Sequence, residues 1–248
     1  MAYRLREDYV FIGEGAADNA LMKSLLKARN LPSFDYPFPD GIRRKKGNAV
    51  EDKEESVGGK DSFAEKLKLL EPVADEQRRS RGILIATDCG DNWKAAFANV
   101  AAQVASTGFY PRPEAPLKAV SPNPKQSAYL PKLVIVMVPG VGESESESKS
   151  ESGGLETLCV EVLRDRHPKT AECLDQYLAC LDGKGVGING WGAETRSKVE
   201  MQCLIAVTNK DDPNKSGRYA IEAGLIDVTH PAFDALAADL QTAIEALS

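Results

Sequence analysis

Apolar residues along the chain follow two patterns, short continuous runs and longer stretches with helical spacing. Three runs predict buried strands, at residues 9–12, 82–87 and 133–138, because each is strongly apolar and ends at turn-forming residues. In the other stretches apolar residues recur every three to four positions, which predicts amphipathic helices. The expected helices cover residues 16–27, 62–70, 93–106, 153–163, 173–181, 197–207 and 233–247.

The order of these elements indicates the fold class. Strands that alternate with helices are typical of an α/β layered fold, so we expect a mostly parallel central sheet flanked by helices, with a helical elaboration towards the C-terminus. Charged insertions near residues 40–57 and 141–153 interrupt the pattern, and the second contains the low-complexity segment 143–148. We expect residues 1–248 to form a single domain that carries both insertions.

Composition narrows the class of protein. A hydrophobic fraction of 42% and a charged fraction of 27% are typical of globular proteins and disfavour disordered, collagen-like or coiled-coil structure. The apolar runs are far shorter than the roughly 20 residues of a bilayer crossing, and the first residues lack the apolar stretch of a secretory signal. Five cysteines and two histidines have no metal-ligand spacing, which disfavours a zinc site or a disulfide scaffold. We therefore expect a cytoplasmic protein without membrane association.

Carboxylates follow two of the predicted strands at the point where each strand ends. Glu14 comes after the first strand and Asp88 directly after the second. Ligand sites in open α/β sheets lie at the carboxyl ends of the strands, and neighbouring strands are about 4.8 Å apart. If these two strands are neighbours, Glu14 and Asp88 can reach one cation. Asp18 lies one helical turn after Glu14, and Asp91 extends the acidic cluster on the second loop.

Several carboxylates held together repel one another unless a hard cation binds between them. Mg²⁺ prefers oxygen ligands and commonly meets phosphate oxygens. One or two such ions can position an attacking water and stabilise a leaving oxygen, so phosphodiester cleavage is a sensible use of this cluster. The structural alternative is that these acids only cap helices or occupy first turns, a role for which Asp18 is well placed.

Other residues point less directly to chemistry. The basic run 43–46 fits a solvated loop better than a contact with a phosphate backbone. Gly58-Gly59-Lys60 suggests phosphate binding at a helix N-terminus, but the rest of an ATP-binding P-loop pattern is missing. His167 and His230 are too few and too far apart in the sequence to indicate a hydrolase triad.

Several motifs resemble those of a known family. Residues 11–18, Phe-Ile-Gly-Glu-Gly-Ala-Ala-Asp, resemble the opening Val-Glu-Gly-x-x-Asp motif of TOPRIM domains, and residues 82–88 resemble their hydrophobic strand followed by Asp-x-Asp. Further motifs are similar to those of small stand-alone bacterial TOPRIM-like proteins, relatives of the OLD-type nucleases. These are Gly58-Gly59-Lys60, Gly153-Gly154-Leu155-Glu156 and residues 197–206 with the terminal helix, so the likeness runs from about residue 9 to residue 247.

The resemblance implies a TOPRIM-like fold with an acidic cleft that binds Mg²⁺ (or Mn²⁺). It implies hydrolysis of nucleic-acid phosphodiesters, DNA in preference to RNA, in phage defence or DNA repair. Glu14 would ligate metal or relay protons, and Asp88 would be a primary metal ligand supported by Asp18 and Glu156. Lys198 would face the scissile phosphate. The expected catalytic residues are therefore Glu14, Asp88 and Lys198, and the expected metal ligands are Glu14, Asp18, Asp88, Asp91 and Glu156.

The chain departs from the TOPRIM pattern at one position. The second aspartate of Asp-x-Asp falls at position 90, where this chain has Gly90, followed by Asp91. One alternative function is therefore a catalytically impaired module that docks a protein partner such as an ATPase subunit. Another is a small-molecule phosphohydrolase that uses the same acidic metal cleft, because a net charge of −6 suits a small substrate better than a nucleic acid.

Overall fold

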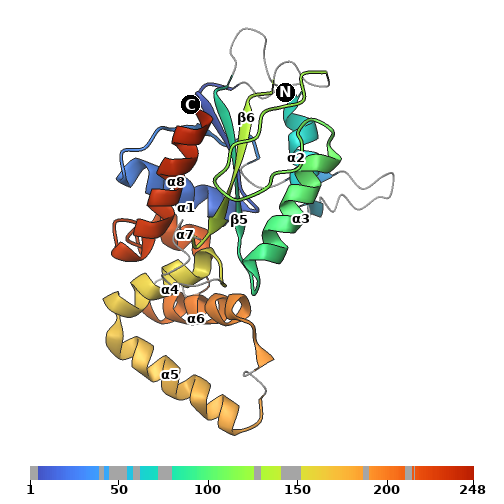
Figure 1. Ribbon diagram of the computed structural model, residues 1–248. Helices are drawn as coiled ribbons and strands as arrows, with labels where there is room; N and C mark the ends of the chain where they lie inside the picture. Colours follow the sequence, from blue (N-terminus) through green and yellow to red (C-terminus); the bar gives the residue numbers. More distant parts are fainter. Residues whose placement is uncertain are drawn as a thin grey trace, which may run out of the picture.

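A four-stranded, all-parallel sheet forms the centre of the protein (Figure 1). Its strand order is β2-β1-β5-β6. The strands are β1 (Tyr9–Ile12), β2 (Phe34–Asp35), β5 (Gly82–Asp88) and β6 (Lys132–Val138). The computed structural model describes residues 5–38, 42–44, 55–57, 62–71, 80–125, 130–140, 152–186, 190–209, 214 and 216–248.

Helices cover both faces of this sheet. α2 (Phe63–Leu70) and α3 (Trp93–Ser106) pack on one face, and α1 (Ala16–Ala28) and α8 (Asp234–Leu247) pack on the other (Figure 1). No helix in the described ranges combines the length and apolar character needed to cross a membrane. The other helices are α4 (Leu155–Arg166), α5 (Pro168–Gly183), α6 (Ala193–Thr208) and α7 (Gly217–Glu222), with a 3₁₀ turn at Pro231–Phe233.

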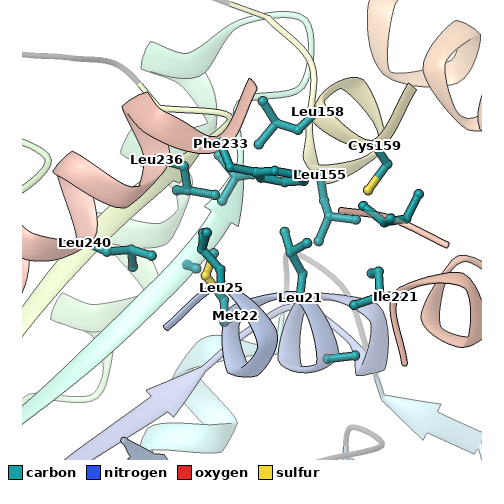
Figure 2. Packing of buried hydrophobic residues seen from close by; sticks show 14 of the residues in the cluster. Leu21, Met22, Leu25, Leu155, Leu158, Cys159, Ile221, Phe233, Leu236 and Leu240 are labelled. Atoms are coloured by element: carbon teal, nitrogen blue, oxygen red, sulfur yellow. The ribbon is translucent and has the colours of Figure 1, made fainter. Parts of the chain in front are cut away.

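Strand side chains alternate between two hydrophobic cores. Phe11 and Leu84 face the core shared by α1, α4 and α8, whereas Ile12 and Ile85 face the core shared by α2 and α3. Figure 2 shows the first core, where side chains of α1 such as Leu25 meet those of α4 and α8. Because both faces of the sheet are covered, its longer strands are continuous apolar runs, which explains why their sequence pattern was recognisable.

The α/β fold class expected from the sequence is confirmed. Two helices begin earlier than expected: α5 at Pro168 and α6 at Ala193. Pro168 takes the first helical position, where its missing N–H costs nothing. β2 and α7 were not expected, because elements of two and six residues are too short to show a period.

Part of the first charged insertion forms an antiparallel pair of strands, β3 (Ile42–Arg44) and β4 (Glu55–Val57). The sequence analysis expected only a charged insertion here, with a solvated loop at the basic run 43–46, and did not predict this strand pair. Residues 45–54 and 58–61, including Lys60, lie outside the described residues, as do residues 141–151 of the second insertion. The single-domain organisation stays a prediction.

A network of charged side chains joins α4, α5 and α6. Arg164 of α4 donates to Glu200 of α6 at 2.8 Å and to both carboxylate oxygens of Asp175 of α5 at 2.7 and 3.0 Å. Arg196 donates to the other oxygen of Glu200 at 2.8 Å. Glu200 is buried, and these two guanidinium groups compensate for its desolvation. The network holds α6, which carries Lys198, against α4.

Candidate functional site

Glu14 and Asp88 meet at the carboxyl ends of two neighbouring strands. β1 and β5 pair in parallel with Ile12 opposite Ile85, so the residues that follow Ile12 lie beside the end of β5. Oε1 of Glu14 accepts hydrogen bonds from the hydroxyl of Thr87 at 2.6 Å and from the backbone N–H of Asp88 at 3.0 Å. The condition set by the sequence argument, that the two strands be neighbours, is therefore met.

Asp88 ends β5 and is held by the start of α4. It is 8% exposed, and its Oδ1 accepts a hydrogen bond from the backbone N–H of Leu155 at 3.1 Å. The N-terminus of a helix stabilises negative charge at this position. Gly154 permits the close approach, because a Cβ added there would lie 2.6 Å from Cγ of Asp88. A side chain at position 154 would therefore displace the carboxylate.

Asp18 lies in the first turn of α1. Its Oδ2 accepts a hydrogen bond from the backbone N–H of Gly15 at 2.6 Å. Asp18 therefore caps the start of α1, the role that the sequence analysis gave as the alternative to metal binding. The pKa of Asp18 is nevertheless raised to about 6, first by burial and then by the charges of Glu14 and Glu156, against the opposing effects of Gly15 and Lys66. Capping therefore does not remove Asp18 from the acidic cluster.

The same carboxylates act on Asp88. Burial raises the pKa of Asp88 well above its usual range, and the charges of Asp18, Glu14 and Glu156 add to the shift, against the hydrogen bond from Leu155. Four carboxylates, from the ends of β1 and β5 and the starts of α1 and α4, thus interact at one place. Such a group needs bound protons or a cation at neutral pH.

Glu156 and Lys198 come from the packed helices α4 and α6. Oε2 of Glu156 is buried and has no hydrogen-bond partner among the described residues. Nζ of Lys198 donates to Oε1 of Glu194 at 2.6 Å, and the lysine side chain is 49% exposed. Burial lowers the pKa of Lys198, but the hydrogen bond to Glu194 and the charges of Glu156 and Asp88 raise it by more. Lys198 is therefore a cation at the rim of the acidic cluster.

Asp91 and Gly90 lie on the loop after β5. Gly90 has a φ of +59° and exchanges two backbone hydrogen bonds with Gly153. Asp91 is exposed, and its carboxylate lies against the backbone of Gly192, the N-cap residue of α6. The structure thus places the carboxylate of Asp91 beside the start of α6.

Lys66 belongs to this site, and the sequence analysis missed it. The residue is 1% exposed on α2, and its Nζ donates to the backbone oxygens of Gly13 at 2.7 Å and Glu14 at 3.2 Å. Burial lowers the pKa of Lys66 to about 8, against the charges of Asp18 and Glu14, which raise it. The available signal was its helical spacing, because Lys66 shares the apolar face of α2 with Phe63.

The chemistry of these side chains fits a hard divalent cation. Mg²⁺ takes carboxylate oxygens, and no donor among the described residues reaches the buried Oε2 of Glu156. Within the described ranges, however, no three Asp, Glu, His or Cys side chains are already close enough together to hold a metal ion. Glu14, Asp18, Asp88 and Glu156 would therefore have to adjust their rotamers to share one.

Comparison with known proteins gives a family match over nearly the whole chain. The family model described as "Protein of unknown function (DUF3226)" matches residues 9–245. No curated protein and no solved structure matches the chain. The matched range runs from the start of β1 into α8 and so includes every residue of the acidic cluster.

Proposed function

The chain belongs to the DUF3226 family, and we propose that it is a metal-dependent hydrolase that cleaves nucleic-acid phosphodiesters, DNA in preference to RNA. The observation that carries this proposal is that Glu14 and Asp88 lie side by side at the carboxyl ends of β1 and β5, with Asp18 and Glu156 near enough for their charges to act on Asp88. Glu14 accepts a hydrogen bond from the backbone at the end of β5. Asp18, Asp88 and Glu156 supply the other three carboxylates. A divalent cation would neutralise the charge of these carboxylates and bind Oε2 of Glu156, which has no hydrogen-bond partner in the described part of the chain.

Each residue has a role that follows from how it is held. Asp88, fixed by the start of α4, and Glu156 would hold Mg²⁺ or Mn²⁺, with Asp18 in support. Such an ion supplies a Lewis acid and positions water for attack on a phosphate. Glu14 keeps Oε1 bonded to the end of β5, which leaves Oε2 to ligate metal or to accept a proton from the water. Lys198 would bind a phosphate oxygen at the rim.

The charge of the chain sets a condition on the substrate. The protein has a net charge of −6 and so repels a polyanionic substrate. A nucleic acid can approach the site only if local cations such as Lys198 offset this repulsion. The same charge favours a second candidate function, hydrolysis of a small phosphoester. We place the proposed activity in the cytoplasm, where all five cysteines would stay the free thiols that they are in this structure.

The test is cleavage by the purified protein of supercoiled plasmid, linear duplex DNA, RNA and nucleotides, each with Mg²⁺, Mn²⁺ or EDTA. We expect nicking or cutting of DNA with either metal and none with EDTA. Glu14→Gln and Asp88→Asn keep the shape of each side chain but remove its charge. Each is expected to lower the rate by about 100-fold or more, because a residue that ligates metal or transfers a proton is lost.

Glu172→Gln is the matched control, because Glu172 is an exposed carboxylate on α5. It is expected to cleave at the wild-type rate. Turnover of nucleotides but not of polymers would favour the phosphohydrolase. Intact substrates throughout, together with no rise in melting temperature on addition of Mg²⁺, would overturn both candidates and favour a module that docks a protein partner.

A further inference from the structure

Lys66 brings a cation to the acidic site from the opposite layer of the protein. Asp18 and Glu156 belong to helices that pack on one face of the sheet, whereas α2 packs on the other face with α3. α2 is anchored to α3, because Oε1 of Gln103 accepts hydrogen bonds from the backbone N–H groups of Phe63 at 3.0 Å and Ala64 at 3.4 Å. The position of the Lys66 ammonium group is therefore set by α2, which is itself held against α3.

The ammonium group sits where β1 turns into α1. Nζ of Lys66 donates to the two successive backbone oxygens of Gly13 and Glu14, the residues that lead into the cluster. Asp18 packs against the same turn, because a Cβ added at Gly13 would lie 2.9 Å from Cβ of Asp18. The charge of Lys66 interacts with both carboxylates, Asp18 and Glu14. The buried ammonium group of Lys66 thus contacts the backbone from which the side chain of Glu14 extends. Its positive charge also offsets the negative charge of the Glu14 carboxylate.

Two explanations account for a lysine buried at this position. In the first, Lys66 only supplies hydrogen bonds to two backbone oxygens, a task that a neutral donor could share. In the second, its positive charge is required, because crowded carboxylates destabilise the folded chain until something neutralises them. Burying an ammonium group is costly unless opposite charges compensate for it. Lys66 is buried with its Nζ 2.7 and 3.2 Å from the backbone oxygens of Gly13 and Glu14, where the charges of Asp18 and Glu14 act on it, and this placement favours the second explanation.

We propose that Lys66 is a positioning residue of the acidic site: it holds the end of β1 through two backbone hydrogen bonds, and it is a resident counter-ion for Glu14 and Asp18 whose positive charge a divalent metal can replace. This inference rests on the proposed metal-dependent function and deepens it. Lys66 does not touch the substrate in this assignment. It acts through the backbone of Gly13 and Glu14 and through the charge of Asp18.

The first test is a double-mutant cycle in EDTA at pH 7.5, read as urea unfolding midpoints. Lys66→Met is compared with wild type, and Lys66→Met/Asp18→Asn with Asp18→Asn. Both comparisons remove the same two hydrogen bonds, so a difference between them reports the charge interaction. We expect the fall in midpoint in the Asp18→Asn background to be about half of that in wild type, or less. Lys169→Met, an exposed lysine on α5, is expected to be additive with Asp18→Asn.

The second test is the rise in melting temperature on addition of Mg²⁺, which needs no substrate. A metal ion can replace the missing positive charge, so the rise is expected to be at least about 2 °C larger for Lys66→Met than for wild type. A lysine that merely holds the fold together would not increase the metal response on removal. If Lys66→Met does not fold, Lys66→Gln takes its place in both tests.

The outcomes separate this inference from the proposed function. No Mg²⁺ response in wild type would overturn the proposed function and the link of Lys66 to metal. A normal wild-type response with additive urea midpoints would overturn the counter-ion role alone. Folding of Lys66→Met or Lys66→Gln only in the Asp18→Asn background would support that role. If neither Lys66→Met nor Lys66→Gln folds in the wild-type or the Asp18→Asn background, the counter-ion role is overturned. Asp18→Asn removes the charge that Lys66 is proposed to balance, so it should restore folding.

Discussion

The backbone N–H of Asp88 donates to Oε1 of Glu14 at 3.0 Å, which ties the end of β5 to the end of β1. The hydroxyl of Thr87 binds the same oxygen at 2.6 Å. Glu14 is therefore held by two donors of one strand, while Asp88 itself is held by the start of α4. This chain of contacts fixes the backbone of the acidic cluster and leaves its remaining oxygens to respond to protons or metal.

Thr87→Val tests the hydrogen bond that the hydroxyl of Thr87 donates to Glu14. Valine keeps the shape of threonine but cannot donate to Oε1 of Glu14, so we expect a loss of about 1 to 3 kcal/mol in the free energy of unfolding. We also expect a smaller rise in melting temperature with Mg²⁺, because Glu14 is less well fixed. Urea unfolding and thermal melts measure these two effects.

Thr107→Val is the matched control for this prediction. Thr107 donates to the backbone oxygen of Val104 at the end of α3, away from the acidic cluster. The loss of this hydrogen bond in Thr107→Val is expected to leave the rise in melting temperature with Mg²⁺ unchanged. Equal Mg²⁺ responses of Thr87→Val and wild type would show that the Thr87 hydroxyl does not position Glu14 for metal.

Asp18→Asn is expected to stabilise the metal-free protein at neutral pH. The pKa of Asp18 is raised to about 6, so its contribution to stability is fully present below its unfolded value near 4 and is lost as pH rises through about 6. Asparagine has no proton to lose. In EDTA, urea unfolding at pH 7.5 should therefore give a variant more stable than wild type by on the order of 2 kcal/mol, a difference that closes by pH 4.

The hydrogen bond from Gly15 survives in this variant, because the asparagine side chain also carries an acceptor oxygen. Mg²⁺ at pH 7.5 is expected to reverse the order of stabilities, since wild type keeps the charge that binds metal. Glu172→Gln should follow the wild-type pH dependence. Parallel curves for wild type and Asp18→Asn would mean that Asp18 ionises in the folded chain as it does in the unfolded chain.

The position of Glu14 and Asp88 could be predicted because the fold class dictates it. Continuous apolar runs identified β1 and β5, and parallel strands bring their carboxyl ends to one edge of the sheet. No contact between side chains had to be known in advance. The TOPRIM resemblance added Glu156 and Lys198, which the structure places on two packed helices next to that edge.

Lys66 and Asp91 could not be placed in the same way, because their positions depend on tertiary packing. Lys66 reaches the cluster only because α2 packs beside the end of β1, which no local pattern encodes. Asp91 is turned towards α6 by a loop in which Gly90 has positive φ and pairs with Gly153. A sequence shows the spacing of Asp91 from Asp88 but not the direction in which that loop turns.

Gly90→Asp tests whether a second aspartate can be added to this loop. A residue at φ +59° pays a conformational cost of about 1 kcal/mol, which aspartate and asparagine tolerate better than other residues. Gly90→Asn is therefore the matched control, with the same backbone cost and no charge. We expect both variants to lose similar stability in EDTA and only Gly90→Asp to gain a larger Mg²⁺ shift than wild type. Equal shifts would show that position 90 does not face the cluster.

Gly154→Ala tests the close approach of α4 to Asp88. The added Cβ would lie 2.6 Å from Cγ of Asp88, so the carboxylate or the start of α4 must move. We expect a loss of about 1 to 3 kcal/mol in the free energy of unfolding and the loss of the Mg²⁺ shift, because Oδ1 of Asp88 can no longer accept from Leu155 at 3.1 Å.

Gly183→Ala makes the same chemical change where there is room for it. A Cβ at Gly183, the last residue of α5, would meet nothing within 4 Å, so alanine there is expected to stabilise the helix by up to about 1 kcal/mol and leave the Mg²⁺ shift intact. Gly154→Ala protein with a normal Mg²⁺ shift would mean that metal binding does not need Asp88 in its present position, and with it the role assigned to the start of α4 would be lost.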